Sequence, residues 1–232
     1  MQQVLGMKVT YTPHTSNDPN SGTITLDHSQ FITAMYNEFK THFAPPKRSV
    51  MSTPMTVKND KRTSNTPSHI EFDKERYKLF RSILGKVSHV ANFTHPEIAT
   101  AVSLVSRNMA NPTQHDLFDV FDIVRYLMGT VNNKHCILTL HYNPNFDANF
   151  THSQNPVHIC CDADLSNDTT TKRSRTGFCG YLFGNLVGWC SRRQPSVSLS
   201  TAESEYMAIS ASAQFAKWYK GLVADMGLET AI

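Results

Sequence analysis

The sequence predicts an α/β protein, and three observations carry that prediction. Residues 75–131 place apolar side chains at helical spacing in three successive stripes. Residues 156–191 change to the alternating or continuous apolar runs that are typical of β-strands. Residues 201–226 return to helical spacing. We therefore expect helices in the middle of the chain, and three strands followed by one long helix in its last third.

Residues 1–57 form a first region in which strands and a helix are mixed. Two strand-like runs, Leu5–Thr12 and Thr23–Leu26, flank a turn-rich stretch at Thr15–Gly22. The first run is already under way at Val4, with almost no residues before it. This start indicates a fragment of a longer protein.

A helix is expected after the second strand-like run, because apolar residues recur at helical spacing from Phe31 to Phe39. Asp27 or Ser29 can cap this helix, and the Pro45–Pro46 pair should end it. Residues 58–74 then have the composition of a linker, since they are polar and rich in Lys, Asn, Ser and Thr.

The helical region at 75–131 should bury its three apolar stripes in a core. Asn111–Pro112 should end the second helix, Thr113 can cap the third, and Gly129 suits the C-terminal end of the third. The stripes are Tyr77, Phe80, Leu84, Val87 and Ala91; then Ile98, Ala101, Val102, Val105 and Met109; then Leu117, Phe121, Val124 and Met128.

The strand region begins with an alternating run from Val157 to Asp162. Two apolar runs follow, Thr176–Phe183 and Leu186–Ser191, and Gly184–Asn185 between them is a signal for a tight hairpin. The long helix runs from Thr201 to about Met226. The residues expected on its inner face are Ala202, Tyr206, Ile209, Ala213, and Phe215 or Ala216.

Composition limits the possible classes of protein. The chain of 232 residues is 40% hydrophobic and 18% charged, which is ordinary for a globular protein and argues against disorder throughout. A net charge of +3 permits a polyanionic partner without requiring one.

The five cysteines are odd in number and contain no CxxC pair, which favours buried free thiols in a reducing compartment. We see no signal peptide and no apolar run long enough to span a membrane, and so expect an intracellular protein.

Two acidic residues could carry chemistry. Asp162 lies near the end of the first predicted strand, and Asp164 should share its face. Ser200 and Glu203 form a capping box, which accounts for Glu203. Glu205 lies about 200° further around the helix, next to Tyr206, on the side expected to face the sheet.

A carboxylate near a packed face needs a partner, and a divalent cation shared between Asp162 and Glu205 would supply one. Mg²⁺ suits such a pair, because it takes few protein carboxylates and keeps waters and substrate phosphates as its other ligands. The alternative also stands on spacing alone: Asp162 and Asp164 would cap a loop, and Glu205 would be a surface charge.

Several motifs occur in an order that resembles one known family. Phe80–Gly85 is similar to "YRSLVG", Asp162–Asp164 to part of "SDADWAGD", and Ser200–Ala208 to "SSTEAEYMA". The other matching segments are Leu5–Met7, Ser52–Met55, Thr94–Ile98, Asn111–Thr113, Val124–Thr130, Lys172–Gly177 and Trp189–Pro195. Together they resemble the Pol polyprotein of copia-type retrotransposons over nearly the whole chain. His95 stands where that family usually has Arg.

The resemblance implies a reverse transcriptase followed by a ribonuclease H that cuts RNA in an RNA–DNA hybrid. Residues 1–57 would be a remnant of the C-terminal part of the polymerase, and 75–131 a helical connection. Residues 156–232 would be a truncated ribonuclease H-like domain, an antiparallel three-strand start of a mixed sheet plus one long helix. On the matching motifs, Asp162 and Glu205 take the first two of four acidic positions, with Mg²⁺ as the implied cofactor.

The motifs of the third and fourth acidic positions do not occur in this sequence, nor does the paired-Asp motif of the polymerase. We therefore expect an inactive fragment. Two other readings stay open: a nucleic-acid-binding module, and an interaction protein such as a domesticated host factor or a pathogen effector. The side chains expected to hold a phosphate backbone in the module are Lys172, Arg173, Arg175, Arg192 and Arg193.

Overall fold

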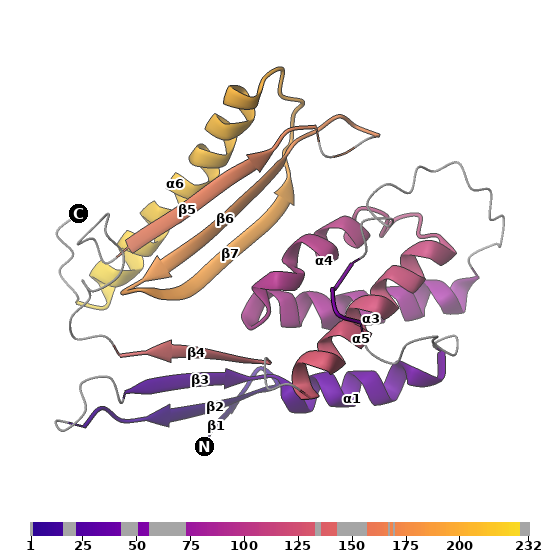
Figure 1. Cartoon of the computed structure of the whole chain (residues 1–232), viewed down its shortest axis with the longest axis horizontal. Helices are drawn as coiled ribbons and strands as arrows, with labels where there is room; N and C mark the ends of the chain where they lie inside the picture. Colours follow the sequence, from indigo (N-terminus) through magenta and orange to yellow (C-terminus); the bar gives the residue numbers. More distant parts are fainter. Residues whose placement is uncertain are drawn as a thin grey trace. The chain divides into compact units, whose positions relative to one another are not determined.

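The computed structural model describes residues 2–15, 22–42, 51–55, 73–132, 136–142, 157–166, 168 and 170–227. These residues form a mixed α/β protein, as predicted, and its strands make two sheets (Figure 1). Most of the expected linker, the Pro45–Pro46 pair and most of the Thr15–Gly22 stretch lie outside the described residues. The chain divides into two compact units, Met1–Thr10 with Thr25–Thr139, and Tyr11–Ile24 with Leu140–Ile232.

The first sheet contains four strands in the order β1-β2-β3-β4. Their bounds are β1 Gln2–Val4, β2 Met7–Thr12, β3 Thr23–Asp27 and β4 Ile137–His141. The single run expected from Val4 is instead a hairpin, because Leu5 and Gly6 both have positive φ angles (50° and 78°) and turn the chain. Sequence patterns did not predict β4.

The helices of the first unit share one core. They are α1 Ser29–Phe39, η1 Lys40–His42, α3 Lys74–Phe93, η2 Pro96–Ile98, α4 Ala99–Ser106 and α5 Gln114–Asn132. The predicted stripes supply most of the buried cluster, and Ile32, Met35 and Phe39 of α1 join it. Met109 is 39% exposed because α4 ends at Ser106, and Gly129 lies inside α5 rather than at its end.

Local capping sets several helix starts. Asp27, one of the two predicted caps of α1, accepts a hydrogen bond from the backbone N–H of Ser29 at 2.7 Å, but the residue at the N-cap position is His28, whose side chain makes no capping hydrogen bond. The predicted cap Thr113 works reciprocally with Asp116: the Asp116 carboxylate accepts from the Thr113 N–H at 2.7 Å, and the Thr113 hydroxyl accepts from the Asp116 N–H at 3.4 Å. Asp73 caps α3 by accepting from the Arg76 N–H, a cap that was not predicted.

The second sheet is the antiparallel meander β5-β6-β7, with β5 Val157–Asp164, β6 Arg175–Leu182 and β7 Asn185–Arg193. The hairpin between β6 and β7 was predicted one residue too late. Its turn residues are Phe183 and Gly184, with φ angles of 48° and 77°, and Asn185 already pairs with Leu182. Two positive φ angles suit the right-handed twist of a two-residue hairpin.

Helix α6, Thr201–Asp225, packs against β5 and β6 (Figure 1). Most of the inner face predicted for this helix is wrong, because Tyr206 is 73% and Ile209 50% exposed. Phe215, which was also predicted for that face, does pack against the sheet. The buried residues are Ser204, Ala208, Ser212, Tyr219 and Val223, which fall within about 100° of arc. Small side chains at three of these positions allow the helix backbone to approach the sheet closely.

Phe215 of α6 fits over two glycines of the sheet. Gly180 and Gly188 pair directly across β6 and β7, and an ideal Cβ on either would stand 2.5 Å or 2.2 Å from the Phe215 ring. The Phe215 ring therefore occupies the space that side chains would fill if residues other than glycine stood at positions 180 and 188. Because Gly180 faces α6, its direct partner on β5, Ile159, faces α6 as well.

Candidate functional site

Asp162 lies on the side of β5 that points away from α6. Strand side chains alternate, so Ile159, Cys161 and Ala163 face the helix while Asp162 and Asp164 take the opposite face. Asp162 is exposed and pairs with Gly177. In the part of the chain that the structure describes, its carboxylate makes no hydrogen bond or ion pair.

Glu205 lies at the edge of the buried face of α6. By helical periodicity it points in about the same direction as the buried Val223, and it is half-buried. Tyr206, which was expected on the same face as Glu205, points outward. Glu203 is used as predicted in a capping box, with a small difference: its N–H donates to the Ser200 hydroxyl at 3.1 Å, and its carboxylate accepts from the Leu199 N–H rather than that of Ser200.

The structure shows no direct contact between Asp162 and Glu205. Their carboxylates have the oxygen-donor chemistry that Mg²⁺ prefers, and neither is committed to another partner among the described residues. Within those same residues, no group of three or more His, Cys, Asp and Glu side chains lies close enough to hold a metal ion. The described sheet and helix therefore provide two separate carboxylates, Asp162 and Glu205.

The five predicted phosphate-binding side chains do not form one exposed set. Lys172 and Arg192 are exposed and Arg173 is half-buried. Arg175 is only 6% exposed, and its Nη1 donates to the Ser191 hydroxyl at 3.3 Å. The Arg175 guanidinium is therefore enclosed by protein atoms and is not presented at the surface as Lys172 and Arg192 are.

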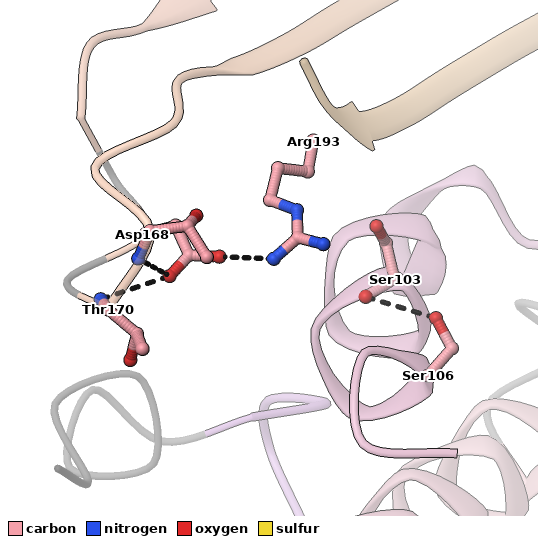
Figure 2. Close-up of polar contacts among 6 residues, drawn as sticks. Ser103, Ser106, Asp168, Thr170 and Arg193 are labelled. Atoms are coloured by element: carbon pink, nitrogen blue, oxygen red, sulfur yellow. Dashed lines mark hydrogen bonds and ion pairs between the residues drawn. The ribbon is translucent and has the colours of Figure 1, made fainter. Parts of the chain in front are cut away.

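Arg193 is also held internally, by an acid that sequence reasoning missed. Its Nη1 donates to the Asp168 carboxylate at 2.8 Å, and Asp168 is 5% exposed (Figure 2). The other oxygen of this carboxylate accepts from the N–H groups of Thr170 and Thr171, both at 3.1 Å. Asp168 thus holds the loop between β5 and β6 against the end of β7.

A buried polar network in the first unit was also missed by sequence reasoning. His28 and His95 are both 0% exposed. The Thr94 hydroxyl lies 2.6 Å from His28 Nδ1 and 2.8 Å from His95 Nδ1, and His95 Nε2 lies 3.3 Å from the Thr130 hydroxyl. Because Thr130 donates its own proton to the Leu127 carbonyl, His95 must donate from Nε2 and accept at Nδ1.

Protonation of the two histidines in this network is unfavourable. Burial, together with neighbouring His89, lowers the pKa of His28 to about 4 despite the opposing effect of Asp27. Burial and the neighbouring His28 lower the pKa of His95 to about 4. Within the described residues, His28 Nε2 has no hydrogen-bond partner, so a proton there would be buried and unsatisfied.

We expect acid to destabilise the first unit through these two histidines. Their pKa values are lower in the folded protein than the unfolded value of 6.5, so the unfolded chain takes up more protons below that pH. Stability should be complete above pH 6.5 and fall as the pH drops toward 4, by on the order of 3 kcal/mol per histidine. Urea unfolding at a series of pH values measures this slope.

His95→Gln is the informative variant for that slope, because Gln retains one acceptor and one donor but does not titrate. The variant should reduce the loss of stability between pH 6.5 and 4. An unchanged slope would show that His95 does not contribute to acid destabilisation.

Comparisons with known proteins agree with the family resemblance. The chain is 33% identical over 168 residues to an uncharacterised mitochondrial protein of Arabidopsis thaliana, covering 72% of this chain and 62% of that protein. It is 28% identical over 228 residues to the retrovirus-related Pol polyprotein from transposon TNT 1-94 of Nicotiana tabacum, covering 98% of this chain. The chain belongs to the retrovirus-related transposon Pol polyproteins. It spans 15% of the length of that tobacco polyprotein.

Another relative of this Pol polyprotein segment has a different description. A secreted RxLR effector protein of Plasmopara viticola is 29% identical over 140 residues, which is 60% of this chain and 89% of the effector.

No protein-family model matches the chain. No solved structure matches it either. In the part of the Pol polyprotein segment that the structure describes, no helix is long and apolar enough to cross a membrane.

Proposed function

We propose that the chain is a copia-type segment of a Pol polyprotein whose last part has a ribonuclease H-like fold and is not catalytic by itself. One observation supports this most: a three-stranded meander is followed by a helix that packs on its first two strands, with Asp162 on the first strand and Glu205 on the helix. That order matches the order of the motifs which resemble the copia-type family.

The lack of activity is inferred from how few ligands these residues offer. By the resemblance, Asp162 and Glu205 would supply carboxylate oxygens to Mg²⁺, which when bound would supply charge neutralisation at a phosphodiester. Asp162 projects from the face of β5 opposite α6, so the two carboxylates do not form a ready-made pair. A two-metal site holds two ions about 4 Å apart and depends on several fixed ligands to do so. Two carboxylates that do not contact one another would bind such ions weakly.

The test is cleavage of a labelled RNA–DNA hybrid by the full chain in Mg²⁺, with Glu205→Gln as the paired variant. We expect no cleavage above the level of Glu205→Gln at any Mg²⁺ concentration. Metal-dependent cleavage by the unmodified chain that Glu205→Gln abolishes would overturn the proposed lack of activity.

A second candidate function is that of an interaction protein, and the effector relative favours it, since the chain covers 89% of that protein. Apolar side chains on the outer side of α6, including Tyr206 and Ile209, are exposed and could contact a protein partner. Affinity capture with the unmodified chain and with a Tyr206→Ser/Ile209→Ser variant tests this candidate. Identical captured proteins from both would argue against the outer side of α6.

A further inference from the structure

Two cysteines face each other across the strands of the second sheet. Cys160 of β5 is the direct register partner of Cys179 of β6, and both belong to the face that points away from α6. Cys160 is exposed and Cys179 is half-buried, and both thiols are free. Directly paired residues of antiparallel strands have Cα atoms about 4.5 to 5.5 Å apart. A disulfide requires a Cα separation of roughly 4.4 to 6.8 Å, a range that includes both of these values.

A histidine stands beside the more exposed of these thiols. His158 precedes Cys160 by two residues on the same strand, so both side chains project from the same face. His158 Nε2 lies 3.2 Å from Cys160 Sγ. At that distance an unprotonated ring nitrogen can accept the thiol proton, and the thiolate is the reactive form of a cysteine. Cys179 differs, because burial raises the pKa of its thiol.

We propose that Cys160 and Cys179 form a reversible cross-strand disulfide when the protein meets a peroxide, with Cys160 as the thiol that reacts first. This site is independent of Asp162 and Glu205 and does not rest on the proposed function. The bond would join β5 to β6 covalently on the face that α6 leaves open.

The chemistry balances in two steps with hydrogen peroxide as the oxidant. Cys160 gives its proton to His158, and the thiolate sulfur attacks one peroxide oxygen; an S–O bond forms, the O–O bond breaks, and the departing hydroxide takes the imidazolium proton to become water. The thiol sulfur of Cys179 then attacks Cys160 sulfur. An S–S bond forms, the S–O bond breaks, and the hydroxyl leaves with the Cys179 proton as a second water. Two thiols are oxidised and one peroxide is reduced.

Two other cysteines of the same sheet supply matched controls. Cys161 and Cys190 both pair with Phe178, so one strand lies between them, and they are on the face that α6 covers. Two strand spacings amount to about 9.5 Å, which exceeds the reach of a disulfide. Phe178 itself packs against Phe215 of α6. Cys161→Ser and Cys190→Ser should therefore leave the oxidation unchanged.

The experiment treats the full chain with one equivalent of hydrogen peroxide, alkylates the remaining thiols, and analyses digests by mass spectrometry. The expected product links the tryptic peptides 135–172 and 176–192, and chymotrypsin then assigns the bond to Cys179, because Tyr181 and Trp189 separate it from Cys190. Two thiols should be lost per molecule and restored by dithiothreitol. Cys160→Ser and Cys179→Ser should each abolish the link.

The role of His158 has its own measurement. His158→Gln should slow the loss of thiols by about tenfold or more at neutral pH, because a general base has been removed. The far-ultraviolet circular dichroism of each variant, compared with that of the unmodified chain, shows that the sheet is intact. A link that survives Cys160→Ser, a link through Cys161 or Cys190, or peroxide that leaves all five thiols reactive would overturn the proposal.

Discussion

Replacing Gly188 with Ala is expected to lower the free energy of unfolding by about 1 to 3 kcal/mol, the usual cost of overpacking a filled site. An ideal Cβ at Gly188 stands 2.2 Å from Cζ of Phe215, far inside contact distance. The Phe215 ring cannot move away freely. Its centroid lies 4.8 Å from that of Phe178 and 4.5 Å from that of Tyr219. Urea unfolding followed by circular dichroism measures the loss.

Gly221→Ala is the matched control, because Gly221 lies in α6 itself and an added Cβ there meets no atom within 4 Å. Alanine favours a helix over glycine, so this variant should be as stable as the unmodified chain or slightly more stable. Phe215→Leu should restore part of the stability of Gly188→Ala, since the smaller side chain relieves the overlap. Equal stability of Gly188→Ala and Gly221→Ala would contradict the proposed fit of Phe215 over the glycines.

Asp168→Ala is expected to cost about 2 to 4 kcal/mol, since it removes a buried charged acceptor and leaves the Arg193 guanidinium without its carboxylate. The Asp168 carboxylate accepts from Arg193 at 2.8 Å and from two backbone N–H groups of the loop at 3.1 Å. The Asp168 backbone also takes part, because its carbonyl accepts from the Lys172 N–H at 2.7 Å. Chemical denaturation measures the cost.

Limited trypsin digestion gives an independent reading of the same loop, since Lys172 and Arg173 lie within it. Asp168→Ala should be cut after these residues faster than the unmodified chain, because loss of the carboxylate frees the loop backbone. Asp162→Ala removes an exposed carboxylate from the adjoining strand and should change neither stability nor cleavage measurably. If the two variants behaved alike, Asp168 would not hold the loop.

The internal pairing of Arg193 also limits what this loop can do with nucleic acid. Of the five cationic side chains predicted to hold phosphates, Arg175 is buried and Arg193 is occupied by Asp168, which leaves Lys172, Arg173 and Arg192. A count of charges in sequence could not show this. The two ends of the ion pair are 25 positions apart, and only the return of β7 beside the loop brings them together.

Features that depend on a few neighbouring residues were predictable from the sequence alone. The three central helices, the Thr113 cap and the Ser200–Glu203 capping box all follow from apolar spacing or from side chains three residues apart. The β6–β7 hairpin was predicted for the same reason, with an error of one residue in its turn. The membership in the Pol polyproteins was likewise visible in the order of short motifs.

The tertiary structure alone decided which face of α6 is buried and which polar groups are enclosed. By apolar spacing, Tyr206 and Ile209 were expected to face the sheet, but Ser204, Ala208 and Ser212 do so. The reason is shape: Phe215 fits over Gly180 and Gly188, and small residues at the other contacts let the helix approach closely enough for that fit. Hydrophobic periodicity identifies the most apolar face of a helix. Which face packs closely also depends on the shape of the surface that the helix contacts. The burial of His28, His95 and Asp168 has the same origin, since each is enclosed by residues that only the fold brings near.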